Sequence, residues 1–127
     1  MKKAIILSAI ILFSITMYAQ STYRITSVTG GTLNSYTNSF EWGKYSEVDM
    51  TLTLKGNVIF ISDKAKSIYI LKGQRPDRLV DGVKMLIWDA IDENEIRCTL
   101  KICTYPDATK MVYVIYRNAG FGYTLEQ

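Results

Sequence analysis

The chain has 127 residues, a length that limits it to one domain of modest size, and its formal net charge is +3. It contains no histidine, so Ser-His-Asp and Cys-His catalysis and histidine-ligated metal sites are excluded. Basic and acidic residues are interspersed, and this near-neutral balance gives no electrostatic reason to expect nucleic-acid binding.

The first residues have the pattern of a secretory signal peptide, because a positively charged tip precedes an apolar run from Ala4 to Tyr18. The run is shorter than the roughly 20 residues that a membrane helix needs. We therefore expect residues 1–19 to be removed after Ala19, leaving residues 20–127 as a single all-β domain with no membrane span. Loss of the two lysines in the leader lowers the net charge from +3 to +1. The expected location is outside the cytoplasm, either periplasmic or secreted.

The first mature segment, Ser21 to Thr29, is rich in Thr, Val, Ile and Tyr and predicts a strand that ends at Gly30-Gly31. A polar loop is expected from Leu33 to Ser39. A short strand is expected from Phe40 to Tyr45.

The stretch from Val48 to Leu71 gives the clearest pattern. Val48 to Lys55 alternates apolar and polar residues without a miss, which is typical of a half-buried strand. Gly56-Asn57 then favours a two-residue hairpin turn. This turn places Leu54 opposite Ile59 and Leu52 opposite Ile61.

A second turn at residues 63–66 would place Ile61 opposite Ile68 and Ile59 opposite Ile70. One face then carries only apolar residues, which fixes the register. These are Met50, Leu52, Leu54, Ile59, Ile61, Ile68 and Ile70. The opposite face carries four large apolar residues that should not all face water. These are Val58, Phe60, Tyr69 and Leu71.

The rest of the chain predicts a turn-rich crossing and a second meander. Residues 73–82 have room for one helical turn between two turn signals. Strands over 83–90 and 96–104 would place Asp89 opposite Arg97 and Trp88 opposite Cys98. The inner face would continue with Val112, Val114 and Tyr116, and the outer face with Met85, Ile87, Tyr113 and Ile115. A last short strand is expected over 121–125.

About eight short strands at regular spacing predict an all-β fold, a small antiparallel β-barrel or β-sandwich of 7–8 strands built from meanders. A barrel of this size resembles the lipocalins in general shape. The resemblance concerns the fold alone and rests on no shared motif.

Covalent and metal chemistry are not expected. Cys98 and Cys103 on one strand would lie roughly 16 Å apart, beyond the reach of a disulfide. The acidic residues near the 91–95 turn do not have the spacing of an EF-hand loop. We therefore expect no enzyme activity, no cofactor, no metal and no disulfide.

The aromatic and apolar residues on the strand faces favour a binding role. The first hypothesis is an exported interaction domain that meets a protein partner, or a second copy of itself, through an apolar sheet face. The alternative is a lipocalin-like barrel that holds a small apolar ligand inside. The candidate binding residues are Phe60, Tyr69, Trp88, Tyr113, Ile115 and Tyr116.

We predict that the exported protein begins at Gln20, because Ala19 is the small residue that signal peptidases require at the cut. Intact-mass measurement of the protein recovered from outside the cytoplasm would show this start. A recovered mass that includes Met1 would contradict it.

Overall fold

The computed structural model describes residues 21–62 and 66–126, and within these ranges every regular element is a β-strand. The predicted signal peptide and most of the turn at 63–66 lie outside the described residues. In the described part, no helix is long and apolar enough to cross a membrane. The strands are β1 (Ser21–Asn34), β2 (Ser39–Trp42), β3 (Ser46–Lys55), β4 (Val58–Ser62), β5 (Lys66–Gln74), β6 (Arg78–Val80), β7 (Val83–Asp92), β8 (Arg97–Thr104), β9 (Lys110–Ile115) and β10 (Ala119–Leu125).

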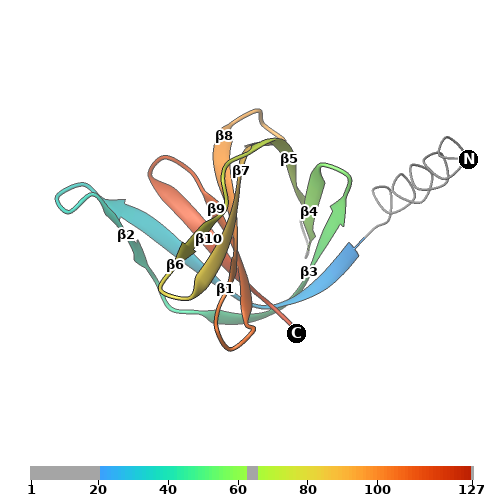
Figure 1. Ribbon diagram of the computed structural model, residues 1–127. Coiled ribbons are helices and arrows are strands. Elements are labelled where there is room, and N and C mark those ends of the chain that lie inside the picture. The colour runs from blue at the N-terminus through green and yellow to red at the C-terminus, as the bar shows by residue number, and fades with distance from the viewer. Residues whose placement is uncertain (1–20, 63–65, 127) are drawn as a thin grey trace, which may run out of the picture.

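The strands form a closed antiparallel barrel. This confirms the all-β prediction and, of the two predicted architectures, the barrel rather than the sandwich. Its order is β1, β3, β4, β5, β7, β8, β9 and β10, and β10 pairs back onto β1. Two short strands are added outside this circuit. β6 extends the pairing along β7, and β2 pairs with the far end of β1. Figure 1 shows the β1–β2 hairpin projecting from the barrel wall, and Tyr36 near its tip is 97% exposed.

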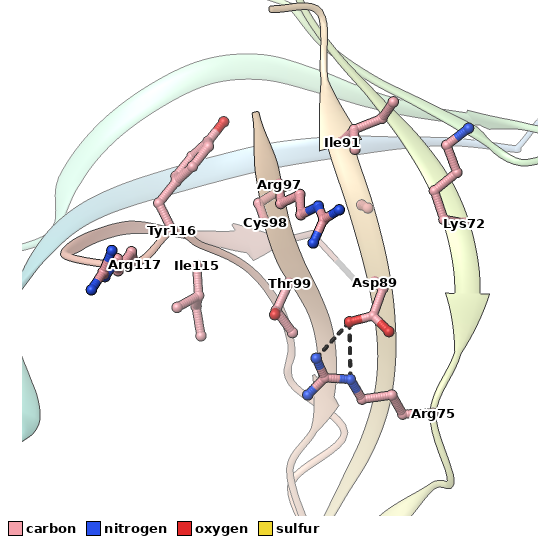
Figure 2. Close-up of a pocket in the computed structure, with 11 residues that line it drawn as sticks. Lys72, Arg75, Asp89, Ile91, Arg97, Cys98, Thr99, Ile115, Tyr116 and Arg117 are labelled. Carbon is pink, nitrogen blue, oxygen red and sulfur yellow. Dashed lines mark hydrogen bonds and ion pairs between the residues drawn. The ribbon is translucent and has the colours of Figure 1, made fainter. Parts of the chain in front are cut away.

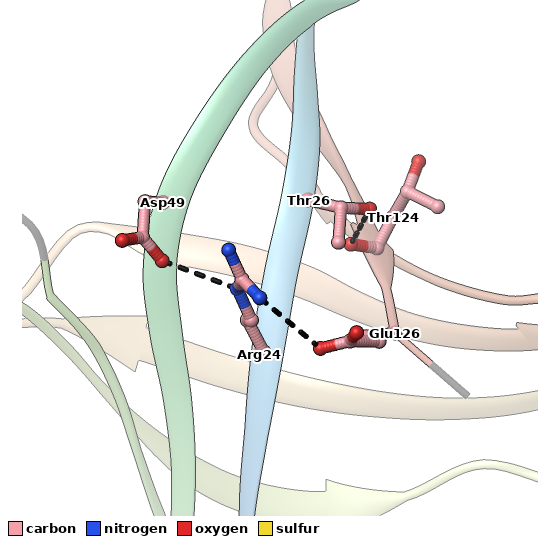
Figure 3. Close-up of polar contacts among 5 residues, drawn as sticks. All are labelled: Arg24, Thr26, Asp49, Thr124 and Glu126. Carbon is pink, nitrogen blue, oxygen red and sulfur yellow. Dashed lines mark hydrogen bonds and ion pairs between the residues drawn. The ribbon is translucent and has the colours of Figure 1, made fainter.

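β1 closes the barrel because it pairs with β3 along one edge and with β10 along the other. A bulge between Ile25 and Ser27 interrupts both ladders. Arg24 also spans the closure, with 3.2 Å from its Nε to Oδ1 of Asp49 on β3 and 3.8 Å from Nη1 to Oε2 of Glu126 (Figure 3). These side chains are exposed, so the backbone ladders stabilise the closure far more than the ion pairs do.

The interior is filled by inward side chains, as expected for eight strands. The predicted β3–β4 register is confirmed, with Leu52 opposite Ile61 and Leu54 opposite Ile59. Val112 and Val114 of β9 join the inner face, again as predicted. The residues of the buried cluster are Ile25, Leu52, Ile59, Ile61, Tyr69, Ala90, Cys98, Leu100, Val112, Val114, Tyr123 and Leu125.

The predicted β4–β5 register is wrong by one residue. Ser62 pairs with Lys66, so Ile59 faces Tyr69 and not Ile70. Because side chains alternate along a strand, this single step reverses the whole of β5. Tyr69 and Leu71 therefore belong to the interior, while Ile68 and Ile70 are on the outer face.

The predicted β7–β8 register is also wrong, by two residues. Ala90 pairs with Cys98 and Asp89 with Thr99, so Asp89 does not face Arg97. A shift of two preserves the faces, and Trp88 still points inward. The helical turn expected within residues 73–82 is absent from the structure, where β5 continues to Gln74 and β6 follows.

Gly30-Gly31 does not end the first strand, contrary to expectation. β1 continues to Asn34, and the second glycine, Gly31, leaves room for an aromatic ring. A methyl group added at Gly31 would lie 2.6 Å from Cε3 of Trp42. At Gly120 on β10 it would lie 3.2 Å from Cη2 of the same ring. Trp42 thus lies across glycines of two neighbouring strands.

Trp42 begins a second cluster on the outside of the barrel. Its ring centroid is 5.1 Å from that of Tyr113 on β9, and the hydroxyl of Tyr113 donates to Met111 at 3.3 Å. Met111 and the outward Cys103 are buried although they face away from the interior. Part of the apolar outer face predicted from the sequence is therefore covered by the chain's own N-terminal segment.

We predict that Gly31→Ala lowers the free energy of unfolding by about 1–3 kcal/mol, because the new methyl group must displace a ring packed against Tyr113. Gly30→Ala is the matched control, since nothing lies within 4 Å of a methyl group there. Urea denaturation of both variants provides the comparison. Equal stabilities would show that Trp42 does not need the space at Gly31.

Candidate functional site

An open groove of about 730 Å³ lies at the ends of β7, β8 and β9, beside β5. Figure 2 shows Ile115 and Arg117 on one side of it, Lys72 and Arg75 on the other, and Thr99 between them. β8 forms the middle of the groove because Thr99 pairs with Asp89 on one side and with Ile115 on the other. The small Thr99 side chain leaves the centre of the groove unfilled.

Four basic residues and a single carboxylate line this groove. The carboxylate of Asp89 accepts a hydrogen bond from Nε of Arg75 at 3.0 Å and also contacts Nη2 of the same guanidinium (Figure 2). None of the ion pairs in the described part of the chain includes Lys72, Arg97 or Arg117. The groove therefore presents three positive charges that are not neutralised by these pairs.

The position of Lys72 has a specific backbone cause. The β5–β7 ladder pairs Leu71 with Ala90 and Gly73 with Asp89, so Lys72 is the extra residue of a β-bulge. Bulges redirect side chains and are common beside functional sites. Lys72 is exposed at the rim of the groove.

The remaining surface of the groove is partly apolar. Ile91 and Ile115 are half-buried and come from the outer faces of β7 and β9. Tyr116 follows β9 and contacts both the groove and the buried cluster. Basic groups around an apolar floor can hold a ligand that carries both charged and apolar parts.

Asp92 and Tyr116 form a polar lock at the edge of the groove. Asp92 is only 7% exposed, and its Oδ2 accepts a hydrogen bond from the Tyr116 hydroxyl at 2.8 Å. Its Oδ1 accepts the backbone N–H groups of Asn94 and Ile96, each at 2.9 Å. Burial alone would raise the pKa of Asp92, but the bonds from Ile96, Tyr116 and Asn94 together lower it. Burial and the hydrogen bond to Asp92 raise the pKa of Tyr116.

The two thiols are unpaired and buried. Burial, and to a smaller extent the Asp92 carboxylate, raises the pKa of Cys98 to about 11. Burial also raises the pKa of Cys103. Thiols are poor nucleophiles when protonated. Within residues 21–62 and 66–126, no group of three or more acidic or cysteine side chains is placed to hold a metal ion.

The structure separates the six residues predicted to bind. Ile115 and Tyr116 line the groove. Tyr69 belongs to the buried cluster and Trp88 packs against it, and Trp88 also lines a shallow hollow between the β3–β4 turn and the end of β5. Tyr113 lies under Trp42. Phe60 is on β4, with Nζ of Lys66 4.5 Å from its ring centroid.

Sequence reasoning missed the basic residues of the groove. Lys72, Arg97 and Arg117 come from three different parts of the chain and form no basic run. They meet only because β5, β7, β8 and β9 are neighbours in the barrel. No local sequence pattern therefore indicated that these basic residues would form one site.

We predict that Tyr116→Phe lowers the free energy of unfolding at neutral pH by about 1–2 kcal/mol, because it removes a hydrogen bond to a carboxylate. A lowered folded-state pKa means that Asp92 stabilises the fold above its ordinary pKa of about 4 and loses this effect as the pH falls through the folded value. The difference between wild type and variant should therefore shrink on acidification. Thermal unfolding from neutral to acidic pH measures this, with the exposed Tyr36→Phe as control. A difference that stays constant with pH would contradict the lock.

Comparison of the chain with protein-family models, with curated proteins and with solved structures gives no match. No relative therefore suggests a ligand for the groove. The side chains of the groove are the basis on which its ligand can be inferred.

Proposed function

We propose that this chain is an exported, non-catalytic binding domain that holds a segment of a partner protein in the groove on its outer wall. The groove itself carries the proposal. At about 730 Å³ it falls within the roughly 300–1,000 Å³ typical of binding sites. Its open position, lined by residues of several neighbouring strands, suits an extended polypeptide.

The filled interior supports a site on the outer wall. Six side chains of the buried cluster are less than 2% exposed, and Trp88 and Tyr116 pack against this cluster. The apolar outer face first expected to bind is partly covered by Trp42. Ile115 is the member of that face that lines the open groove.

The chemistry of the chain supports a non-catalytic role. The full sequence has no histidine, and burial keeps the Cys98 and Cys103 thiols protonated at neutral pH. The export part of the proposal is supported by the pattern of residues 1–19, with its charged tip and short apolar run.

We predict that peptides selected from a random display library on the wild-type domain lose about tenfold or more in affinity for Thr99→Trp, which fills the centre of the groove. Thr51→Trp is the matched control, because Thr51 is exposed on β3 and does not line the groove. Fluorescence anisotropy measures both variants, after circular dichroism has shown that they are folded. Selected peptides that bind Thr99→Trp as well as wild type would refute the groove as the binding site.

A further inference from the structure

The charge of the groove differs from that of the whole domain. Its lining has four basic side chains and one acidic one, and the acidic one is paired with Arg75. Without the two lysines of the leader, the chain carries only +1. The groove lining is thus more positive than the domain as a whole. Such a lining attracts negatively charged partners and repels positive ones.

Three cations in the groove are available to a ligand. Lys72, Arg97 and Arg117 are exposed and take part in none of the ion pairs of the described residues. They come from three different elements, the β5 bulge, the start of β8 and the β9–β10 turn. Figure 2 shows Arg97 in the middle and Arg117 and Lys72 at the two sides. A ligand that meets all three must carry several separated negative charges.

The apolar part of the groove narrows the class of ligand. Ile91, Ile115 and Tyr116 lie between the cations, so part of the ligand has to be apolar. A nucleic acid or a sulfated glycan is charged at every unit and favours surfaces with a denser basic lining. On an extended polypeptide every second side chain lies on the same face, so carboxylate and apolar side chains two residues apart can contact one groove.

We propose that the occupant of the groove is an acidic segment of a partner protein, in which acidic and apolar side chains occupy alternate positions on one face of an extended strand. Its carboxylates pair with Lys72, Arg97 and Arg117, and its apolar side chains contact Ile91 and Ile115. Arginine is suited to this role because its planar guanidinium binds a carboxylate through two hydrogen bonds. This inference rests on the proposed function and adds the chemical class of the partner.

The test uses a short fluorescent peptide that repeats Glu-Ser-Leu-Ser, so that Glu and Leu share one face of the extended chain, with Gln-for-Glu and Lys-for-Glu versions as comparisons. Anisotropy should show binding of the Glu peptide that weakens with added salt and weaker binding of the Gln and Lys versions. Arg97→Glu and Arg117→Glu should each reduce the affinity about tenfold or more, because each reverses one charge contact. Both residues are exposed, so the variants should fold. Lys44→Glu, an equal charge change on an exposed residue outside the groove, should have no effect.

Three results would overturn the inference. Equal binding of the Gln and Glu peptides would show that charge is not recognised. Tighter binding of oligothymidylate or heparin than of the Glu peptide would identify a general polyanion site. Equal loss in Lys44→Glu would indicate a non-specific charge effect.

The failure of this inference can be told apart from failure of the proposed function. If selected neutral peptides bind wild type and lose affinity in Thr99→Trp, the groove is a binding site and only the acidic partner is wrong. If Thr99→Trp leaves both neutral and acidic peptides bound, the groove is not the site and both proposals fail.

Discussion

The structure depends on the closure of the barrel by β1. This strand pairs with β3 along one edge and with β10 along the other, so the first and last strands of the barrel become neighbours. Without this pairing, the sheet would have two long open edges able to pair with other chains. Closure also fixes the size of the interior, because eight strands leave space that side chains alone can fill. Six inward residues that are less than 2% exposed occupy that space, namely Ile25, Ile59, Ile61, Leu100, Val112 and Val114.

A filled barrel leaves its outer wall as the surface on which neighbouring strands can bring distant residues together. Part of that wall is covered by the chain itself. Trp42 lies over Gly31 and Gly120 and reaches Tyr113, and this helps to bury Met111 and Cys103 on the outer face. The groove occupies another part of this wall, and Ile115 is the outer-face residue of β9 that lines it. The β1–β2 hairpin therefore helps to set which part of the apolar wall is open to a partner.

The sequence was sufficient where a local feature fixed the geometry. Gly56-Asn57 is a two-residue turn, and it determined the β3–β4 register correctly. The connection between Ser62 and Lys66 is one residue shorter than expected, and that difference exchanged the inner and outer faces of β5. The charges of Asp89 and Arg97 suggested a pairing that the β7–β8 hairpin does not make. Asp89 instead pairs with Arg75, the residue that follows β5. Opposite charges close in sequence thus did not predict the strand register, because Asp89 had another basic partner in the fold.

The groove could not be predicted because its parts are joined only by tertiary structure. Two of its residues, Ile115 and Tyr116, were predicted from the apolar pattern of one strand. Lys72 depends on a bulge in the β5–β7 ladder, and no composition signal marks such a bulge. The glycines at 31 and 120 show the same limit, because both make space for the Trp42 ring from another strand. Sequence patterns report neighbours along the chain, and these features depend on neighbours across it.

The polar lock at Asp92 connects the stability of the fold with the shape of the groove. Asp92 holds the N–H groups of Asn94 and Ile96, so it fixes the turn from which Arg97 begins β8. Tyr116 closes the lock from β9 and also lines the groove. One buried carboxylate therefore joins the end of β7, the β7–β8 turn and the residue that follows β9. Backbone and hydroxyl donors satisfy this carboxylate, and it takes part in none of the ion pairs of the described residues. The same arrangement that stabilises the turn therefore leaves Arg97 exposed and outside these ion pairs.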